Sequence, residues 1–176
     1  MFPSLSLAAV LLLSPTPPPA DNAVGNVEDL VFPVEDIIGE VESLDGTETE
    51  TKQGKQVTVA LTSDVLFALD KWALTGKAGQ RLAQVAARVK AEGAAGQIKV
   101  LGHTDDQGAD AYNLALSRRR AAAVERALRG RLPGFTFQVQ GFGESRPKLP
   151  NLVDGSPVEA NRAKNRRVEI VFDARQ

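Results

Sequence analysis

A single cation inside an apolar helical face constrains this sequence more than any other feature. From Ile98 a short alternating strand leads to Gly102 and a polar turn, and a segment without helix breakers then runs from about Ala111 to Leu128. On a helical wheel this segment has one apolar face, and Arg120 falls in the middle of it. A guanidinium buried in such a face is strongly unfavourable unless an anion meets it. The segment therefore predicts a strand, a turn and a helix that bring an anionic group to Arg120.

The surrounding sequence predicts an α+β fold. Residues 56–173 follow the order β-α-β-α-β-β, a sandwich with two helices packed on one face of a mixed sheet. Thr75 is a plausible N-cap for the first of these helices, whose apolar residues recur at helical spacing. A long Pro- and Asn-rich loop is expected at 145–164. Alternating apolar residues predict strands at 56–61, 98–101, 135–139 and 168–172.

Residues 1–23 differ in character from this domain. Their apolar run, Leu5–Leu13, is too short to cross a bilayer as a helix, and prolines and small residues follow it. The pattern predicts a signal peptide, export to the cell envelope, and no transmembrane segment in the mature chain. Because no Lys or Arg precedes the run, a disordered apolar tail is the alternative.

Residues 24–55 form an acidic extension between that segment and the domain. Leu30–Val34 and Ile37–Val41 have the composition of extended chain, and Asp45-Gly46 is a turn signal. Residues 47–54 are expected to be a charged connection. We therefore expect a hairpin that adds strands to the edge of the main sheet.

Charge is unevenly distributed along the chain. Residues 21–70 contain 12 acidic and 2 basic side chains, whereas residues 71–176 contain 10 acidic and 19 basic ones. The basic part could lie against an anionic polymer. Nucleic acid is not expected, because the aromatic residues of this part are few and several have the spacing of a strand core. Trp72 is expected in the core or against the hairpin.

Short motifs follow one another between Val57 and Phe172. They are Gly102-His103-Thr104-Asp105, Gly108, Tyr112-Asn113, Leu116-Ser117, Arg120-Ala121, Gly141-Phe142-Gly143-Glu144, Pro147, Asn151 and Asn165-Arg166-Arg167-Val168-Glu169-Ile170. In residue type and spacing they resemble the OmpA-like C-terminal domain family. Two features depart from that pattern: Asn161 replaces a frequent glycine, and no transmembrane barrel precedes the domain. We therefore expect an exported, single-domain member of the family.

The resemblance implies a function and a set of site residues. The implied function is non-covalent binding of peptidoglycan through the diaminopimelate of its stem peptide, which would anchor the protein to the cell wall. Asp105 and Arg120 correspond to the family residues that hold the diaminopimelate zwitterion. Asp70 corresponds to a polar position in the first strand. The remaining implied ligand-binding residues are Thr104, Gln107, Asn113 and Arg166.

The chemistry of the residues is compatible with this assignment. The end of diaminopimelate presents an ammonium and a carboxylate on one carbon, so it needs one anion and one cation a few ångströms apart. Asp105 can supply the anion, and the Arg120 guanidinium can hold a carboxylate through two hydrogen bonds. A purely structural salt bridge between Asp105 and Arg120 has the same spacing. Without ligand, the two side chains are expected to bond each other.

Other functions have weaker support in the sequence. His103 with Asp105 and Asp106 lacks the spacing of a metal site, and no metal or other cofactor is expected. No nucleophile stands beside a base, so an enzyme is not expected; Glu144 is expected to stabilise its own Gly-rich turn. The alternative to a simple anchor is an envelope interaction protein, in which acidic residues 26–55 recruit a protein partner.

Overall fold

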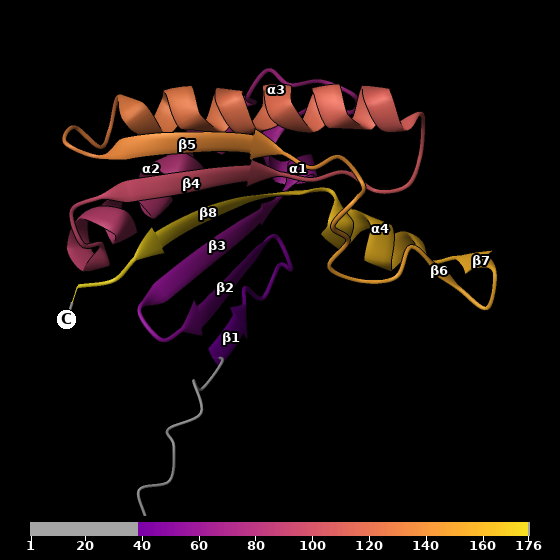
Figure 1. The fold of residues 1–176 in the computed structure, drawn as a ribbon, viewed down its shortest axis with the longest axis horizontal. Coiled ribbons are helices and arrows are strands. Elements are labelled where there is room, and N and C mark those ends of the chain that lie inside the picture. Colours follow the sequence, from indigo (N-terminus) through magenta and orange to yellow (C-terminus); the bar gives the residue numbers. More distant parts are fainter. Residues whose placement is uncertain (1–38, 176) are drawn as a thin grey trace, which may run out of the picture. The chain divides into compact units, whose positions relative to one another are not determined.

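The alternating segments form a six-stranded mixed sheet in the computed structural model, which describes residues 39–175 (Figure 1). The predicted signal peptide and the Leu30–Val34 run lie outside these residues. No helix within them is long and apolar enough to cross a membrane. In chain order the elements are β1 (Gly39–Glu42), β2 (Glu48–Gln53), β3 (Gln56–Thr62), α1 (Ser63–Leu66), α2 (Gly76–Glu92), β4 (Gln97–Gly102), α3 (Asp110–Arg129), β5 (Thr136–Gly141), β6 (Leu152–Val153), β7 (Ser156–Pro157), α4 (Glu159–Asn165) and β8 (Arg167–Asp173).

The strands of the main sheet lie in the order β1-β2-β3-β8-β4-β5. Within this sheet, β4 and β5 are the parallel pair, and α3 makes the crossover that parallel neighbours require. The last strand, β8, lies between β3 and β4 and is antiparallel to both. The prediction of an α+β fold with helices packed on a mixed sheet is confirmed.

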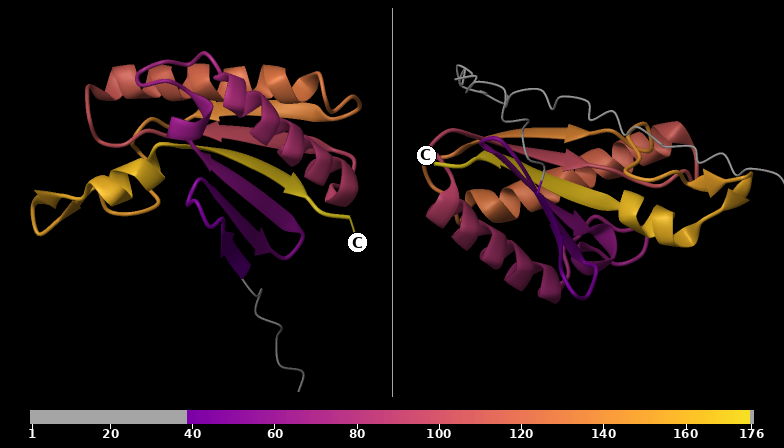
Figure 2. Two further views of the ribbon diagram at one scale, coloured as in Figure 1. Left: turned by 180° about the vertical axis from the view of Figure 1, so that it is seen from behind. Right: turned by 90° about the horizontal axis from the view of Figure 1, so that it is seen from below.

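Helices α2 and α3 lie side by side against the sheet and cover its apolar face (Figure 2). Thr75 caps α2 as predicted, because its Oγ1 accepts a hydrogen bond from the Ala78 amide (3.2 Å). Alternation along the central strands directs their apolar side chains into one core with those of the helices. Its fully buried members include Val59, Leu61, Leu82, Ile98, Val100, Val124, Leu128 and Ile170.

Two glycines let α3 approach the sheet at backbone distance. A Cβ atom on Gly102 would lie 2.2 Å from the Ser117 carbonyl oxygen, and one on Gly141 would lie 2.4 Å from the Arg118 amide nitrogen. Neither position can hold a larger residue unless the helix moves. Ser117 Oγ completes the contact by accepting a hydrogen bond from the Gly143 amide (2.9 Å). The N-terminal half of α3 is thereby fixed against the ends of β4 and β5, where the polar turn begins.

Three segments differ from the sequence prediction. Strand β2 occupies most of the expected charged connection, because pairing with β3 completes its hydrogen bonds despite a wholly polar sequence. Residues 145–164 are not a plain loop, since they contain the β6–β7 hairpin and most of α4, which lacks an apolar periodicity. A short helix, α1, separates β3 from Asp70. That residue lies in a turn with a positive φ of 59° and not on the first strand.

The acidic extension, where the structure describes it, forms the hairpin β1–β2 at the edge of the sheet. Every residue of β1 is exposed, so ion pairs fix its position in place of apolar packing. Each carboxylate of residues 39–55 meets a basic group of the same chain: Glu40 with Lys148 (3.0 Å), Glu42 with Lys164 (3.2 Å), Asp45 with Arg81 (2.6 Å), and Glu48 and Glu50 with Arg88 (3.0 and 2.6 Å).

Candidate functional site

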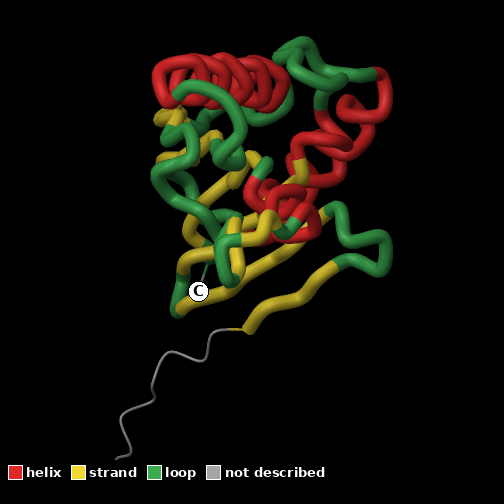
Figure 3. The backbone as a smooth tube through the Cα atoms, turned by 90° about the vertical axis from the view of Figure 1, so that its right-hand side faces the viewer, coloured by secondary structure: helices red, strands yellow, loops and turns green. Residues whose placement is uncertain are grey.

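A pocket of about 530 Å³ opens at the end of the domain where β4 ends and α3 begins. Figure 3 looks onto this end, where the loops lie among the ends of the helices. The walls come from α1 and the loop after it, the turn before α3, the first half of α3, and α4. All seven residues that the sequence resemblance implied line this one pocket: Asp70, Thr104, Asp105, Gln107, Asn113, Arg120 and Arg166.

Asp105 is a buried carboxylate in the floor of the pocket, with 5% of its surface exposed. Its Oδ1 accepts a hydrogen bond from the Gln107 amide (3.1 Å), which closes the turn on itself. Thr104 Oγ1 donates to the Asp105 carbonyl (3.0 Å). Arg166 Nη1 donates to Asp105 Oδ2 (2.7 Å). The carboxylate is therefore held at a fixed position before any ligand arrives.

Arg166 forms ion pairs with three carboxylates. In addition to Asp105 it contacts Glu159 (2.9 Å) from α4 and Asp64 (3.4 Å) from α1. Burial alone would lower the pKa of the Arg166 guanidinium, but its bonds to these three carboxylates raise the pKa above the usual range. The expectation that Asp105 and Arg120 bond each other is therefore wrong. Arg166, which lies 61 residues further along the chain, is the partner of Asp105 instead.

Arg120 is buried and lacks such a partner. Only 5% of its surface is exposed, and its guanidinium lies 5.2 Å from the centre of the Phe67 ring. Its Nε donates to the Lys71 carbonyl (3.0 Å). No carboxylate of residues 39–175 lies within 4.0 Å of it. Burial lowers the pKa of Arg120, and the more distant charges of Asp64 and Asp70 offset this only in part.

Another wall of the pocket is formed by the first half of α3 and the loop after α1, which a hydrogen bond connects. The Tyr112 hydroxyl donates to Asp70 Oδ1 (2.9 Å), and this bond to an anion raises the pKa of Tyr112. Leu69, beside Asp70, is almost completely exposed. The pocket lining also includes residues that were not predicted as site residues, among them Asp64, Phe67, Leu69 and Glu159. For Asp64 and Glu159 the available signal was an acidic residue in the first turn of a short helix.

Asn113 has a supporting position within the same pocket. Its Nδ2 donates to Glu144 Oε2 (2.6 Å) and to the Gln107 carbonyl (3.1 Å). Asn113 is 2% exposed, so its amide ties the turn before α3 to the turn after β5. Glu144 was expected to stabilise its own turn, and its partner is this side chain of α3, 31 residues away. The Gln107 side chain is exposed, lines the pocket and has no hydrogen-bond partner within residues 39–175.

His103 lies outside the pocket. Its ring is buried, stacks on Phe142 with 5.3 Å between centroids, and places Nε2 3.7 Å from Glu169 Oε2, beyond hydrogen-bond distance. Residues 39–175 contain no group of three or more His, Cys, Asp or Glu side chains placed to hold a metal ion. The charged groups that line the pocket are the four carboxylates of Asp64, Asp70, Asp105 and Glu159 and the two guanidinium groups of Arg120 and Arg166.

This α+β scaffold with a charged pocket at the start of α3 defines a ligand-binding module. Residues 66–166 match the OmpA family, and the chain belongs to that family. YfiB of Escherichia coli is 31% identical over 124 residues, which cover 69% of this chain and 74% of that protein. Outer membrane protein A of Citrobacter freundii is 37% identical over 116 residues, 62% of this chain and 49% of that protein. The chain thus spans about half of the latter relative and most of the former.

Solved structures share the fold. The cell wall anchor of the T6SS from Pseudomonas aeruginosa superposes with a TM-score of 0.56 at 25% identity, covering 78% of this chain and 88% of that one. A MotB-like protein from Desulfovibrio vulgaris superposes with a TM-score of 0.57 at 30% identity, covering 78% of this chain and 82% of that one. The periplasmic domain of Helicobacter pylori MotB gives 0.60 at 22% identity, covers 78% of this chain and 88% of that one, and so supports the fold alone.

Proposed function

We propose that this domain binds peptidoglycan non-covalently through the diaminopimelate of its stem peptide and so anchors the protein to the cell wall. The observation that carries the proposal is Arg120, a buried guanidinium that lines the pocket without a carboxylate partner among residues 39–175. Membership of the OmpA family and similarity to a structure described as a cell wall anchor support it.

The two charges of the ligand have complementary groups in the pocket. Its carboxylate would accept hydrogen bonds from the terminal nitrogens of Arg120, since within residues 39–175 only Nε of that side chain forms a hydrogen bond. Its ammonium would meet the carboxylates of Asp105 and Asp70. Four carboxylates and two guanidinium groups line the pocket, so its own charge favours an ammonium-bearing ligand over a simple acid.

A single site of this kind should bind weakly. Diaminopimelate has about a dozen heavy atoms, and ~0.3 kcal/mol per atom gives roughly 4 kcal/mol, which corresponds to a millimolar dissociation constant. Retention on the wall would then depend on neighbouring contacts and on repeated sites along the polymer. Nanomolar binding of free diaminopimelate in calorimetry would contradict this estimate of affinity.

The test compares two purified cell walls that differ in one group. Peptidoglycan with lysine in place of diaminopimelate keeps the side-chain ammonium but lacks the second carboxylate. We expect co-sedimentation with diaminopimelate-type wall and about ten- to a hundredfold weaker retention on lysine-type wall, since one charge-assisted contact is lost. Arg120→Lys should lose the same preference, because an ammonium cannot hold a carboxylate through two parallel bonds. Equal retention of the wild-type protein on both walls would refute the proposed ligand.

We propose further that the protein is exported to the cell envelope. The support is the apolar run Leu5–Leu13 with its following prolines and small residues, together with family membership. N-terminal sequencing of protein from the native host should find a start near Asp21 or Val24, and an intact Met1 would contradict it. Recruitment of a partner by residues 26–55 has less support, because the carboxylates of 39–55 are engaged within the chain.

A further inference from the structure

A second hollow lies along α3, on the other side of the loop that walls the pocket. The loop after α1 contributes Ala68, Leu69 and Asp70 to the pocket, and its continuation contributes Trp72 to a groove of about 450 Å³. The complete lining of this groove is Trp72, Ala73, Leu74, Ala123, Arg126 and Ala127. Trp72 was expected in the core or against the hairpin, yet 43% of its surface is exposed and it lies beside Arg119 of α3. Core packing therefore does not account for this side chain.

The groove combines an aromatic surface with cations. The Arg119 guanidinium lies 4.7 Å from the centre of the Trp72 ring, and Arg126 lines the groove one to two helical turns further on. Neither arginine forms an ion pair within residues 39–175. An indole with flanking guanidinium groups suits a ligand that has a flat face of C–H bonds and a nearby carboxylate.

The position of the groove relative to the pocket indicates which ligand this is. Arg120 and Arg126 are six residues apart on one helix, which is about 9 Å along its axis. A polymer that places one unit in the pocket would therefore present its next units to the groove. We propose that the groove is a second subsite for the wall polymer, in which a sugar ring packs on Trp72 and a stem-peptide carboxylate meets Arg126.

This proposal rests on the proposed function of the pocket, and its test separates the two. The ligands are a stem tripeptide that ends in diaminopimelate and the same tripeptide joined to its disaccharide. Trp72 is the only tryptophan of the chain, so quenching of its fluorescence by acrylamide reports on the groove alone. We expect the disaccharide-peptide to bind roughly five- to tenfold more tightly than the tripeptide, which is the lower end of the range for one aromatic stacking contact, and to protect Trp72 from acrylamide.

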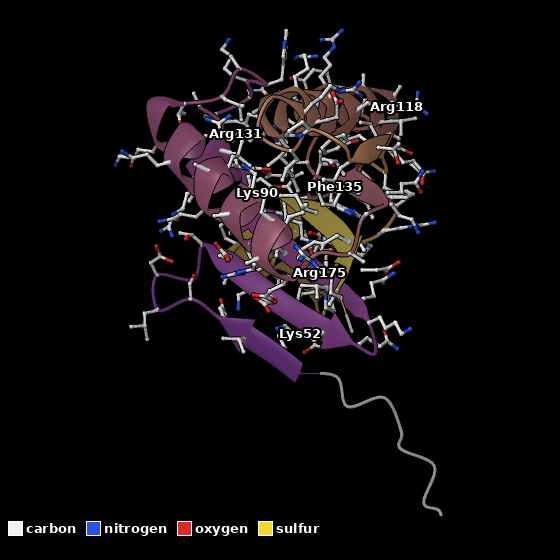
Figure 4. The ribbon with its side chains drawn as sticks, turned by 90° about the vertical axis from the view of Figure 1, so that its left-hand side faces the viewer. Lys52, Lys90, Arg118, Arg131, Phe135 and Arg175 are labelled. Atoms are coloured by element: carbon white, nitrogen blue, oxygen red, sulfur yellow. The ribbon has the colours of Figure 1, made fainter. Side chains whose placement is uncertain are left out.

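Substitutions supply the second arm of the experiment. Trp72→Ala should reduce the affinity for the disaccharide-peptide to that for the tripeptide and leave tripeptide binding unchanged. Arg126→Gln should lower the disaccharide-peptide affinity by a smaller factor. Arg118→Gln is the matched control, because it removes the same charge from α3 at a residue that points away from α2 (Figure 4) and does not line the groove.

The other possible results would exclude either the second subsite or the proposed function of the pocket. Equal affinities of the wild-type protein for the two ligands, with Trp72 quenched equally in both complexes, would overturn the second subsite and leave the pocket intact. Absence of binding to either ligand would overturn the proposed function itself. A blue shift of Trp72 emission with phosphatidylglycerol vesicles, and none with the disaccharide-peptide, would assign the groove to a membrane surface and overturn the proposal.

Discussion

The β1–β2 hairpin and the pocket are both dense in charge, but they use it differently. In the hairpin, every carboxylate of residues 39–55 has a basic partner, and all of these pairs lie at least partly in solvent. In the pocket the charges are unevenly matched. Arg166 contacts three carboxylates, whereas Arg120, which is more deeply buried, contacts none of those that the structure describes.

On the proposed function, this difference distinguishes charges that stabilise the fold from a charge that binds a ligand. Exposed pairs each contribute little to stability and are screened by salt. A buried carboxylate without its partner is strongly destabilising, so the Asp105–Arg166 pair is structural. An unpaired buried guanidinium lowers stability, and such a cost is a recurrent feature of functional sites.

The largest effect is expected from breaking the pocket's buried pair. Arg166→Ala should lower the free energy of unfolding by ~3–5 kcal/mol, because it leaves Asp105 buried without a cation. Urea unfolding at neutral pH measures the loss. The double variant Asp105→Asn, Arg166→Ala should recover part of it, since the uncompensated charge is then absent. A loss below about 1 kcal/mol for the single variant would place this pair with the exposed ones of the hairpin.

An intermediate effect is expected at Glu169 on β8, a half-buried carboxylate paired with Arg167 (2.7 Å). Burial would raise its pKa, but the neighbouring His103 imidazole and the Arg167 guanidinium outweigh burial and lower the pKa to about 2. The folded-state pKa of Glu169 lies below its unfolded-state pKa. Its ionised carboxylate therefore adds on the order of 3 kcal/mol to the free energy of unfolding above about pH 4.5, and this stabilisation is lost as pH falls towards 2.

Unfolding free energies at pH 7, 4 and 2.5 test this window. Glu169→Gln should be less stable than the wild-type protein at pH 7, and the difference should shrink as pH falls because the wild-type carboxylate becomes protonated. Asp173→Asn, at the exposed end of the same strand, is the control. If the wild-type protein and Glu169→Gln lose stability in parallel between pH 5 and 2, Glu169 does not carry the acid dependence.

The smallest effect is expected in the hairpin. Lys148→Ala and Lys164→Ala each remove one exposed pair to β1, so each should change the free energy of unfolding by less than about 1 kcal/mol. The difference from the wild-type protein should disappear in about 1 M salt, where the Debye length is roughly 3 Å. If either variant loses several kcal/mol of unfolding free energy and the loss persists in high salt, the ion pairs of the hairpin stabilise the fold as strongly as the buried pair of the pocket.

The fold class and seven of the residues that line the pocket could be predicted from the sequence, but other lining residues, among them Asp64 and Glu159, and the pairing inside the pocket could not. Periodicity in the strand-turn-helix segment predicted that Arg120 is buried, and the family motifs identified residues that fold into one pocket. The partner of Asp105 is a tertiary contact with a residue 61 positions away, and two arginines compete for it. Sequence spacing alone favours the nearer arginine, whereas the path of β8 and α4 brings Arg166 closer.

Polar elements were missed for a related reason. Strand β2 and helix α4 have no apolar periodicity. Ion pairs and backbone hydrogen bonds stabilise them, in place of packing against the hydrophobic core. Because α4 was not predicted, the contribution of its residue Glu159 to the pocket was not predicted either. Trp72 was expected in the core or against the hairpin, but it lines a groove beside Arg119.

The most direct test of the account is the stability of Arg120→Met with and without ligand. Methionine keeps much of the side-chain volume and removes the unpaired charge, so we predict that unfolding without ligand requires ~1–2 kcal/mol more than in the wild-type protein. A diaminopimelate-containing tripeptide at ten times its dissociation constant should stabilise the wild-type protein by about 1.4 kcal/mol and leave Arg120→Met unchanged. A variant several kcal/mol less stable than the wild-type protein, with no ligand-induced shift in either, would show that Arg120 supports the fold and does not bind the wall.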